Sequence, residues 1–323
     1  MKRYPCFLLI AVATCFAAAI PAWAQQYPVR AVRLIVPFPP GGGTDTMARV
    51  IGPKLSEALG QQIVPENRGG AGANIGAEIA AKSPPDGYTL ILATITNAIG
   101  ASLYSKLNYD LVRDFAPITR LATTPHILVV HPSVPVKTVK EFTAFARARP
   151  GELTYSSSGA GSAAHLAGEL FSSLTGVKMV HVPYKGGGPS MIALVGGEVS
   201  VCFATMPSAV GYVRSGRLRG IAVTTEKRSP SMPELPTIAE TGVAGYEAGS
   251  WYGLSAPAGT SKEIIARLHA ETIKVMALPD IKERLFNAGF EVVTSSPEQF
   301  AEFTRTEIQK WGKLVKATGL KAD

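Results

Sequence analysis

The chain is short of cysteine and of charge, and beyond its first 24 residues it has no long apolar segment. Of its 323 residues, three are cysteines and 17% are charged. Only Cys202 lies beyond residue 24, so no internal disulfide is available there and the fold depends on its apolar core. No segment in this part stays apolar for eighteen residues, which predicts that it is soluble.

Sequence motifs of several enzyme classes are absent as well. There is no H-x-x-x-H or H-E-x-x-H spacing for a metal and no G-x-S-x-G elbow for a serine nucleophile. Neither of the common glycine-rich nucleotide motifs, G-x-x-x-x-G-K-[ST] and G-x-G-x-x-G, occurs. We therefore predict no metal and no cofactor. Lysine and arginine are spread along the chain without clusters or interleaved aromatics, which argues against a nucleic-acid partner.

The first 24 residues have the pattern of a cleaved signal peptide. Lys2 and Arg3 precede an apolar stretch from Phe7 to Ile20, and Ala22-Trp23-Ala24 forms an A-x-A cleavage site. The apolar stretch is short for a membrane span. We expect cleavage after Ala24 and export to the periplasm. Cleavage removes two positive charges and no acid, which lowers the net charge from +8 to +6.

Strand-like and helix-like patterns alternate along the remaining chain, which predicts an α/β fold with largely parallel sheets. The strand-like runs are 31–36, 62–66, 88–93, 126–131, 178–182, 199–204 and 218–224. The helix-like patterns are 44–59, 73–81, 138–148, 162–175, 189–196, 260–277 and 298–316. Thr138 and Thr260 begin predicted capping boxes, and Gly60 and Gly176 stand where glycines end helices.

The mature length of about three hundred residues is natural for two lobes. Two regions, 115–132 and 224–238, have the composition of crossings between lobes. These crossings assign 26–122 plus 228–323 to lobe 1 and 123–227 to an inserted lobe 2. Two crossings permit hinge closure without large strain. One wide domain with an irregular loop is the alternative.

The strongest functional signal is a structural pattern that occurs three times. A short apolar run leads through a glycine-rich turn into a helical pattern at 34–45, at 153–162 and at 179–189. Such a turn leaves backbone N–H groups free at the positive end of a helix, which suits an anion. Glycine also serves turns without a ligand. Three turns, with more than a hundred residues between the first and the others, favour an anion held between two lobes.

The predicted ligand-binding residues lie in these turns and at one strand end, the edge where open α/β sheets bind ligands. They are Pro40, Gly41, Gly42, Gly43, Asp45, Thr96, Gly159, Gly161, Ser162, His165, Tyr184, Gly186 and Gly187. The first two turns carry no lysine or arginine, so recognition there relies on N–H groups, each contributing about 1.5–3 kcal/mol to a charged partner. We expect side chains at Gly42 and Gly161 to block binding with the fold intact, and Asp45 to act mainly on helix capping.

An exported hydrolase or isomerase acting on a small acid is the alternative to a receptor. Ser162 and His165 are three residues apart and would share a helix face, which makes them the one plausible catalytic pair. Ser162 fits a helix N-cap better than a nucleophile. Cys202, inside an apolar run, is predicted to be an inert core residue.

Several segments together resemble one known family over residues 27 to 321. They include Pro37-Phe38-Pro39-Pro40-Gly41-Gly42-Gly43-Thr44-Asp45, Glu66-Asn67-Arg68, Pro85-Asp86-Gly87-Tyr88, Asp114-Phe115-Ala116-Pro117-Ile118, Gly159-Ala160-Gly161-Ser162 with His165-Leu166, His181-Val182-Pro183-Tyr184-Lys185-Gly186 and Trp251-Tyr252-Gly253. In these segments the chain resembles the Bug-type, or TctC-type, periplasmic solute-binding proteins of tripartite tricarboxylate transporters.

The resemblance implies a two-lobe Venus-flytrap fold, type II-like, in which facing loops grip a ligand carboxylate. By position, the gripping loops are 39–45 and 159–165, with 184–187 shaping the pocket. The implied partners are a small organic acid (a di- or tricarboxylate, an aromatic acid or an amino acid) and membrane transporter subunits, and we expect a monomer. A receptor that serves sensing alone is an alternative. Ser200 stands where many relatives carry an acid, which favours a plain carboxylate over an amino acid.

Overall fold

The computed structural model describes residues 27–318, so the predicted signal peptide lies outside the described residues. The first elements are β1 (Val32–Val36), α1 (Gly43–Leu59), β2 (Ile63–Asn67), α2 (Asn74–Ala81), β3 (Thr89–Thr94), α3 (Ile95–Leu103), β4 (Phe115–Val130), α4 (Val139–Arg147), β5 (Thr154–Ser157) and α5 (Ala163–Thr175). They are followed by β6 (Val180–Pro183), α6 (Gly187–Val195), β7 (Val201–Thr205), α7 (Met206–Arg214), β8 (Arg219–Val223), the 3₁₀ helix η1 (Ala239–Thr241), β9 (Gly249–Pro257), α8 (Lys262–Ala277), α9 (Pro279–Asn287), β10 (Glu291–Val292) and α10 (Pro297–Thr318).

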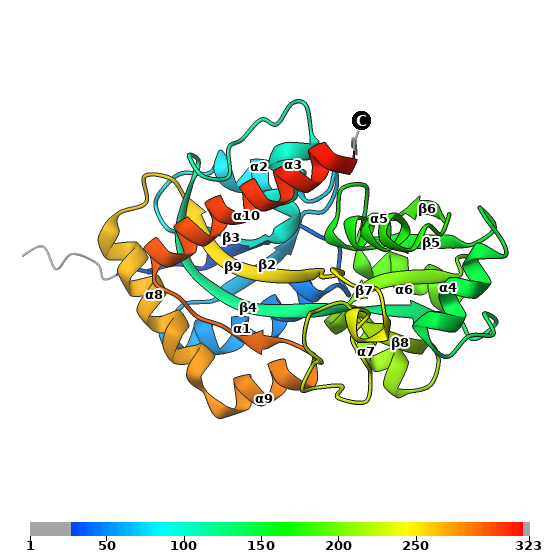
Figure 1. Cartoon of the computed structure of the whole chain (residues 1–323). Coiled ribbons are helices and arrows are strands. Elements are labelled where there is room, and N and C mark those ends of the chain that lie inside the picture. Colours follow the sequence, from blue (N-terminus) through cyan, green and yellow to red (C-terminus); the bar gives the residue numbers. More distant parts are fainter. Residues whose placement is uncertain (1–26, 319–323) are drawn as a thin grey trace, which may run out of the picture.

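The strands form two mixed sheets that share the long strand β4 (Figure 1). In the first sheet, β2, β1 and β3 run parallel, and β9 pairs antiparallel with both β3 and β4. In the second, β6, β5 and β7 run parallel, and β7 and β8 both pair antiparallel with β4. We call residues 27–125 and 249–318 half A, and residues 126–248 half B.

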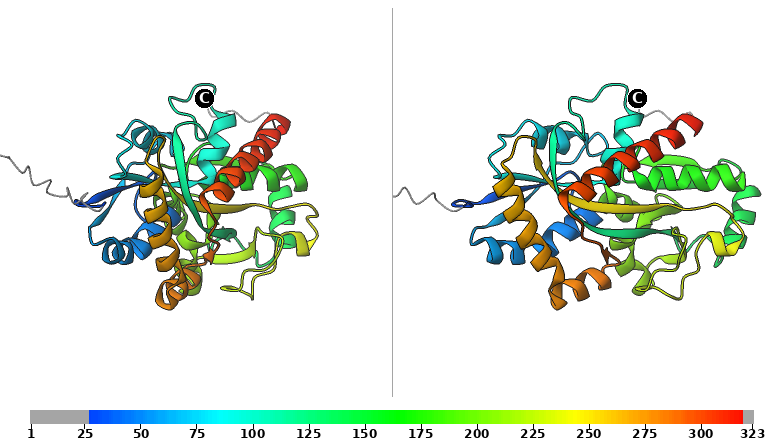
Figure 2. Two further views of the ribbon diagram at one scale, coloured as in Figure 1. Left: turned by 90° about the vertical axis from the view of Figure 1, so that its left-hand side faces the viewer. Right: turned by 60° about the vertical axis from the view of Figure 1, so that its left-hand side comes forward.

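Helices cover both faces of the first sheet because its strands are apolar on both sides. On β1, Leu34 packs with α1, α8 and α9, whereas the next residue, Ile35, packs with α2, α3 and α10. This is the two-sided burial expected of parallel strands. Figure 1 shows α10 crossing the sheet on the same side as α2 and α3, and both views in Figure 2 agree.

The helix α10 is fixed to half A by a buried carboxylate. Trp251 on β9 and Trp311 on α10 both donate an indole N–H to Glu307 Oε2 at 3.0 Å. Glu307 is 9% exposed. The last described helix is therefore a packed part of half A.

Two strands connect the halves at the same level. Pairing of β4 with β9 ends at Pro125 opposite Gly249, and pairing of β4 with β7 begins at His126 opposite Thr205. Proline lacks the N–H of a sheet ladder and is suited to such a break. The chain thus leaves half A at Pro125 and returns to it at Gly249.

The segment after β8 packs with half B. Ile238, Tyr246 and Ala248 belong to the same apolar cluster as Leu128 on β4. The Thr224 hydroxyl donates to Ala248 O at 2.6 Å, which holds this segment to the end of β8. We therefore propose His126 to Ala248 as lobe 2, extending the predicted boundary.

Most predicted helix ends are confirmed. Gly60 and Gly176 are left-handed C-caps with φ near 70°, and Thr138 caps α4 by accepting from the Glu141 N–H. The prediction that Thr260 caps α8 is wrong, since Ser261 accepts from Ile264 N–H there. The Thr260 hydroxyl instead donates to Pro257 O at 2.8 Å.

Other elements escaped prediction. The structure adds α3, α7, α9, η1, β9 and β10 to the predicted helices and strands. Across residues 27–318, no helix combines the length and apolar character needed to cross a membrane. Cys202 is buried as predicted, and burial raises the pKa of its thiol.

Candidate functional site

Five helices begin around one small cavity of about 40 Å³ between the halves. Helices α1 and α3 come from half A, and α5, α6 and α7 come from half B. The lining residues are Phe38, Gly42, Gly43, Thr44, Thr94, Ile95, Thr96, Ser158, Ala163, Ala164, Gly187, Thr205, Ser208, Ser250 and Tyr252. None of them is charged, but seven carry hydroxyl groups on serine or threonine and one on tyrosine. The positive ends of the helix dipoles therefore dominate the electrostatics of this cavity.

The turn before α1 is held by a carboxylate within its own helix. Gly41, with φ of 87°, donates its N–H to Asp45 Oδ2 at 3.1 Å. Arg49 Nε donates to the same oxygen at 2.9 Å, and Asn67 Nδ2 donates to Oδ1 at 3.1 Å. Burial opposes ionisation of Asp45, but these hydrogen bonds, with that of Arg49 foremost, keep its pKa below the ordinary value. Asp45 therefore clasps the turn.

The clasp leaves the next two N–H groups available. Gly42 is the N-cap of α1 and has no side-chain cap. Among the described hydrogen bonds, the N–H groups of Gly43 and Thr44 have no protein partner, and both residues line the cavity. A Cβ at Gly43 would lie 2.3 Å from the Tyr252 hydroxyl oxygen, so only glycine fits there in this conformation.

The turn before α5 has the same design with different groups. Gly161, with φ of 72°, donates its N–H to His165 Nδ1 at 3.1 Å. Ser162 caps α5 by accepting from the His165 N–H at 3.3 Å. The N–H groups of Ala163 and Ala164 have no protein partner among the described residues, and both alanines line the cavity.

This arrangement does not assemble the alternative catalytic pair. Ser162 is fully buried, and its hydroxyl oxygen meets the backbone of His165. The ring of His165 bonds the N–H of Gly161 through Nδ1. Gly161 is also no exposed loop tip, because a Cβ there would lie 2.0 Å from Leu103 Cδ2. The expectation that a side chain at Gly161 leaves the fold intact is therefore wrong.

The turn before α6 meets the turn before α1 across the cavity. Gly186 is the N-cap of α6 with φ of 144°, and Gly187 lines the cavity. A Cβ at Gly42 would lie 3.8 Å from Gly187 N, which is ordinary contact. Tyr184 lies outside the cavity, and its hydroxyl donates to Glu198 at 3.4 Å. The cavity wall predicted for Tyr184 is instead formed by Tyr252.

Sequence reasoning missed the helices α3 and α7. Thr94 and Asn97 form a capping box at the start of α3, which brings Thr96 to the cavity. Thr205 and Ser208 at the start of α7 share a hydrogen bond of 2.8 Å. No glycine turn precedes either helix, so the signal used for the other three was absent.

Of the predicted residues, four line the cavity: Gly42, Gly43, Thr96 and Gly187. The others shape the turns behind it or lie beside it: Pro40, Gly41, Asp45, Gly159, Gly161, Ser162, His165, Tyr184 and Gly186. The structure therefore assigns most of the predicted glycines to turn geometry, and the residues just after them to the cavity.

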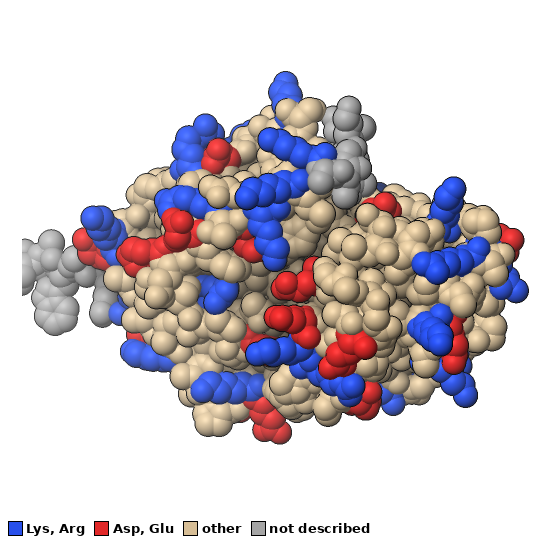
Figure 3. Space-filling view, in the orientation of Figure 1, with Lys and Arg blue, Asp and Glu red and all other residues tan. Residues whose placement is uncertain are grey.

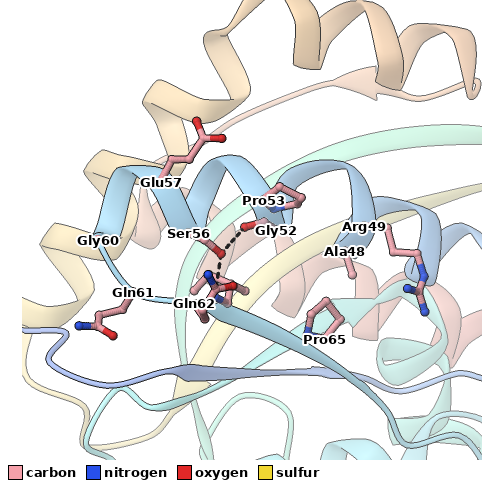
Figure 4. Close-up of a pocket in the computed structure, with 11 residues that line it drawn as sticks. Ala48, Arg49, Gly52, Pro53, Ser56, Glu57, Gly60, Gln61, Gln62 and Pro65 are labelled. Carbon is pink, nitrogen blue, oxygen red and sulfur yellow. Dashed lines mark hydrogen bonds between the residues drawn. The ribbon is translucent and has the colours of Figure 1, made fainter.

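A larger hollow lies on the outside of half A (Figure 4). It has a volume of about 920 Å³ and lies between α1 and β2. Its wall is closed by internal hydrogen bonds: the Ser56 hydroxyl donates to Gly52 O and accepts from Ile63 N–H, each at 2.8 Å. No helix begins there to supply free N–H donors. We therefore place the candidate site at the small cavity.

Charged side chains of both signs are mixed on one face of the molecule. On the face shown in Figure 3, lysine and arginine are interspersed with aspartate and glutamate over both halves. In the part of the chain that the structure describes, no cluster of three histidine, cysteine, aspartate or glutamate side chains is placed to hold a metal ion.

Comparisons with known proteins show the family of the chain. The sequence profile of the Tripartite tricarboxylate transporter family receptor, TctC, matches residues 47–320. Protein BugT of Bordetella pertussis (strain Tohama I) is 38% identical over 323 residues, which cover 99% of each chain.

Two solved structures with ligands are similar to the chain. R. palustris Rpa4515 with adipate is 40% identical, with a TM-score of 0.88 over 91% of this chain and 99% of that one. MatC (Rpa3494) from Rhodopseudomonas palustris with bound malate is 34% identical, with a TM-score of 0.85 over 90% of this chain and 100% of that one. These likenesses confirm the predicted α/β periplasmic binding protein fold.

Proposed function

The chain belongs to the TctC family of periplasmic solute-binding receptors, and from this premise we propose that it binds a small organic acid by one carboxylate. The family consists of receptors and not of enzymes. The proposed site is the cavity where the five helices begin. The proposed task is delivery of the acid to a membrane transporter of the same system, in the periplasm.

The observation that carries the proposal is the pair of free N–H groups at each of two facing helices. Gly43 and Thr44 supply two donors from half A, and Ala163 and Ala164 supply two from half B. Four hydrogen bonds to a charged group, at about 1.5–3 kcal/mol each, offset the desolvation of one carboxylate. A cation would meet the positive helix ends and is disfavoured.

Two relatives support an aliphatic acid as the ligand class. The similar structures contain adipate in one case and malate in the other. The cavity of this chain offers no carboxylate to an ammonium group, since its lining is uncharged. We therefore propose a di- or hydroxycarboxylate in preference to an amino acid.

We propose that the halves move apart to admit the acid, because residues of both halves line the small cavity. The two crossing strands meet at Pro125 and Gly249, where the pairing of the two sheets changes over. We propose that opening bends the molecule at this level and that closure brings both pairs of N–H groups onto the carboxylate.

The test is ligand-dependent stabilisation of protein that has been unfolded and refolded to remove bound acid. We expect adipate, malate or another acid from a panel to raise the free energy of unfolding by about 2.7 kcal/mol at a hundredfold excess over Kd. A panel of aromatic acids, amino acids, sugars and cations completes the screen. Tight binding of a sugar or a cation, with no response to any acid, would overturn the proposal.

A matched pair of variants locates the site. Gly43→Ala places a methyl group against the Tyr252 hydroxyl in the cavity lining, so we expect affinity to fall about a hundredfold, or 2.7 kcal/mol. Gly42→Ala introduces the same methyl group one residue earlier in ordinary contact, which replaces the sequence-based expectation that a side chain at Gly42 blocks binding. Its affinity should stay within about threefold. Equal affinities for the two variants would place the ligand elsewhere.

A further inference from the structure

Two histidine rings are stacked beneath the turn before α5. His165 on α5 and His181 on β6 have ring centroids 3.9 Å apart and ring planes 9° apart. The ring of Tyr155 on β5 lies against both, with centroids 6.4 Å from His165 and 4.9 Å from His181. None of the three rings lines the cavity. The arrangement therefore supports the turn from outside the proposed site.

The hydrogen bonds of His165 show its protonation. Its Nδ1 accepts the Gly161 N–H at 3.1 Å, so this nitrogen carries no proton. In a neutral ring the proton is then on Nε2, which faces Glu169 Oε1 at 3.8 Å. Glu169 also accepts a hydrogen bond from the Tyr155 hydroxyl. The ring is therefore oriented at both nitrogens.

The hydrogen bonds of His181 lead to the same tautomer. The Ser157 hydroxyl donates to Gly159 O at 3.0 Å and accepts the Gly159 N–H at 3.1 Å. The only proton of this hydroxyl is thereby used, so His181 Nε2, at 2.7 Å from Ser157 Oγ, must be the donor. The two stacked rings together bind the turn at Ser157 and at Gly161.

We propose that His165 and His181 are positioning residues that hold the turn 157–161 so that the next two N–H groups face the ligand carboxylate. The inference rests on the proposed function. With the Gly161 N–H turned to His165, the free donors that follow are those of Ala163 and Ala164. The pair contacts the turn and not the ligand.

The same geometry makes the turn sensitive to acid. A proton on His165 Nδ1 removes this acceptor of the Gly161 N–H and places a charge on a ring whose centroid is 3.9 Å from that of His181. The titratable groups that face His165 are Glu169 on its own helix, His181 on β6 and Tyr155 on β5. Only the Glu169 carboxylate favours the added charge, and it also accepts from Tyr155. We expect ligand affinity to fall as the pair takes up a proton.

The environment keeps the pair neutral at neutral pH. Burial lowers the pKa of His165, and Glu169 opposes this shift without reversing it. Burial, with His165 as a second cause, lowers the pKa of His181 to about 3. His165 is therefore the first of the two to take up a proton as the pH falls below the ordinary histidine value of 6.5.

The test compares two substitutions of His165 with adipate and malate as probes. His165→Ala removes the acceptor for Gly161, and we expect about tenfold weaker binding near pH 7.5, the effect of one lost hydrogen bond. His165→Asn offers an amide oxygen in place of Nδ1 and cannot take up a proton, so we expect affinity within about threefold of wild type. Titration calorimetry measures both.

The pH profile separates positioning from a merely structural role. As the pH falls below 6.5, wild type should lose more affinity than His165→Asn, because only wild type titrates at this position. Titration of the probe itself is common to both proteins and cancels in the comparison. Equal pH profiles for the two proteins, or full affinity in His165→Ala, would overturn the proposal.

A measurement without ligand distinguishes the failure of this inference from failure of the proposed function. Exchange of the Gly161 amide hydrogen should be slow in wild type and in His165→Asn, and at least about tenfold faster in His165→Ala. If this holds and no acid binds, the positioning role stands and the proposed function fails. If acids bind and the Gly161 amide exchanges equally in all three proteins, the positioning role fails alone.

Discussion

The turns before α1 and α5 use the same hydrogen-bond spacing with opposite chemistry. In each turn a glycine N–H donates to the side chain four residues later, Gly41 to Asp45 and Gly161 to His165, both at 3.1 Å. The acceptor in half A is a carboxylate that also binds Arg49. The acceptor in half B is a neutral imidazole stacked on a second one. Both turns leave the two N–H groups after the N-cap free for a ligand.

Because the two acceptors, Asp45 and His165, take up protons in different pH ranges, the two turns should lose their hydrogen bonds at different pH. The pKa of Asp45 is lowered from 3.8, so its stabilising effect is present above that value and is lost only as the pH falls through the lowered pKa. The pKa of His165 is lowered from 6.5, so its effect is complete above 6.5 and declines below it. Acid should therefore disable the turn of half B first.

The largest expected effect is the loss of folding stability in acid caused by a buried histidine of half B. His126 in half B is fully buried, and its Nε2 lies 2.8 Å from Ser250 Oγ. Burial lowers its pKa from 6.5 to about 4. The unfolded chain therefore binds a proton in this range that the folded chain does not, and stability should fall by about 2–3 kcal/mol between pH 6.5 and pH 4.5.

Denaturant unfolding across this pH range measures the effect. His126→Gln is the matched variant, because its amide can still bond Ser250 and does not titrate. Its stability should change less than that of wild type by the same 2–3 kcal/mol. Parallel curves for the two proteins would show that buried histidines do not make half B acid-sensitive.

A smaller effect tests the charged clasp of half A. Asp45→Ala leaves the N–H groups of Gly41 and Asn67 without their acceptor, and we expect a loss of about 2 kcal/mol of folding stability. This exceeds the value of about 1 kcal/mol for a helix cap alone. Arg49→Ala is the control, since the Arg49 side chain is 59% exposed and its ion pair contributes at most about 0.5 kcal/mol. Equal losses in the two variants would contradict the clasp.

The smallest effect concerns the caps. Ser162 caps α5 with its hydroxyl, whereas Gly42 at the start of α1 has no side-chain cap. Ser162→Ala should therefore cost about 1 kcal/mol of stability, while the bound acid is recovered chemically unchanged from both proteins. Product formation by wild type that Ser162→Ala abolishes would restore the hydrolase alternative.

The sequence predicted those parts of the site in which a helix follows a glycine-rich turn. Strand, glycine turn and helix follow one another at Gly42, Gly161 and Gly187, and the structure has α1, α5 and α6 there. The helix α3 could not be predicted in this way, because it follows β3 directly and Thr94 is both the strand end and the N-cap. Pro207 near the start of α7 was a usable signal.

The sequence could not show which N–H groups of each turn are bonded within the protein and which are free. From the sequence, Gly41, Gly43 and Gly161 are all predicted to bind the ligand, since all stand in glycine-rich turns. In the structure, the N–H groups of Gly41 and Gly161 are already bonded, and residues up to three positions further along each turn line the cavity. Which N–H groups are free depends on side chains four residues away, and short-range patterns of glycine do not contain that information.

Four backbone amides, two at α1 and two at α5, are the proposed donors to the ligand carboxylate. Nuclear magnetic resonance of the ¹⁵N-labelled protein titrated with adipate, malate or another acid that binds should move the amide proton signals of Gly43, Thr44, Ala163 and Ala164 downfield, because each gains a charged acceptor. The signals of Gly41 and Gly161, already bonded to Asp45 and His165, should move much less. Saturation of the protein with acid while those four signals stay unmoved would contradict binding at the helix N-termini.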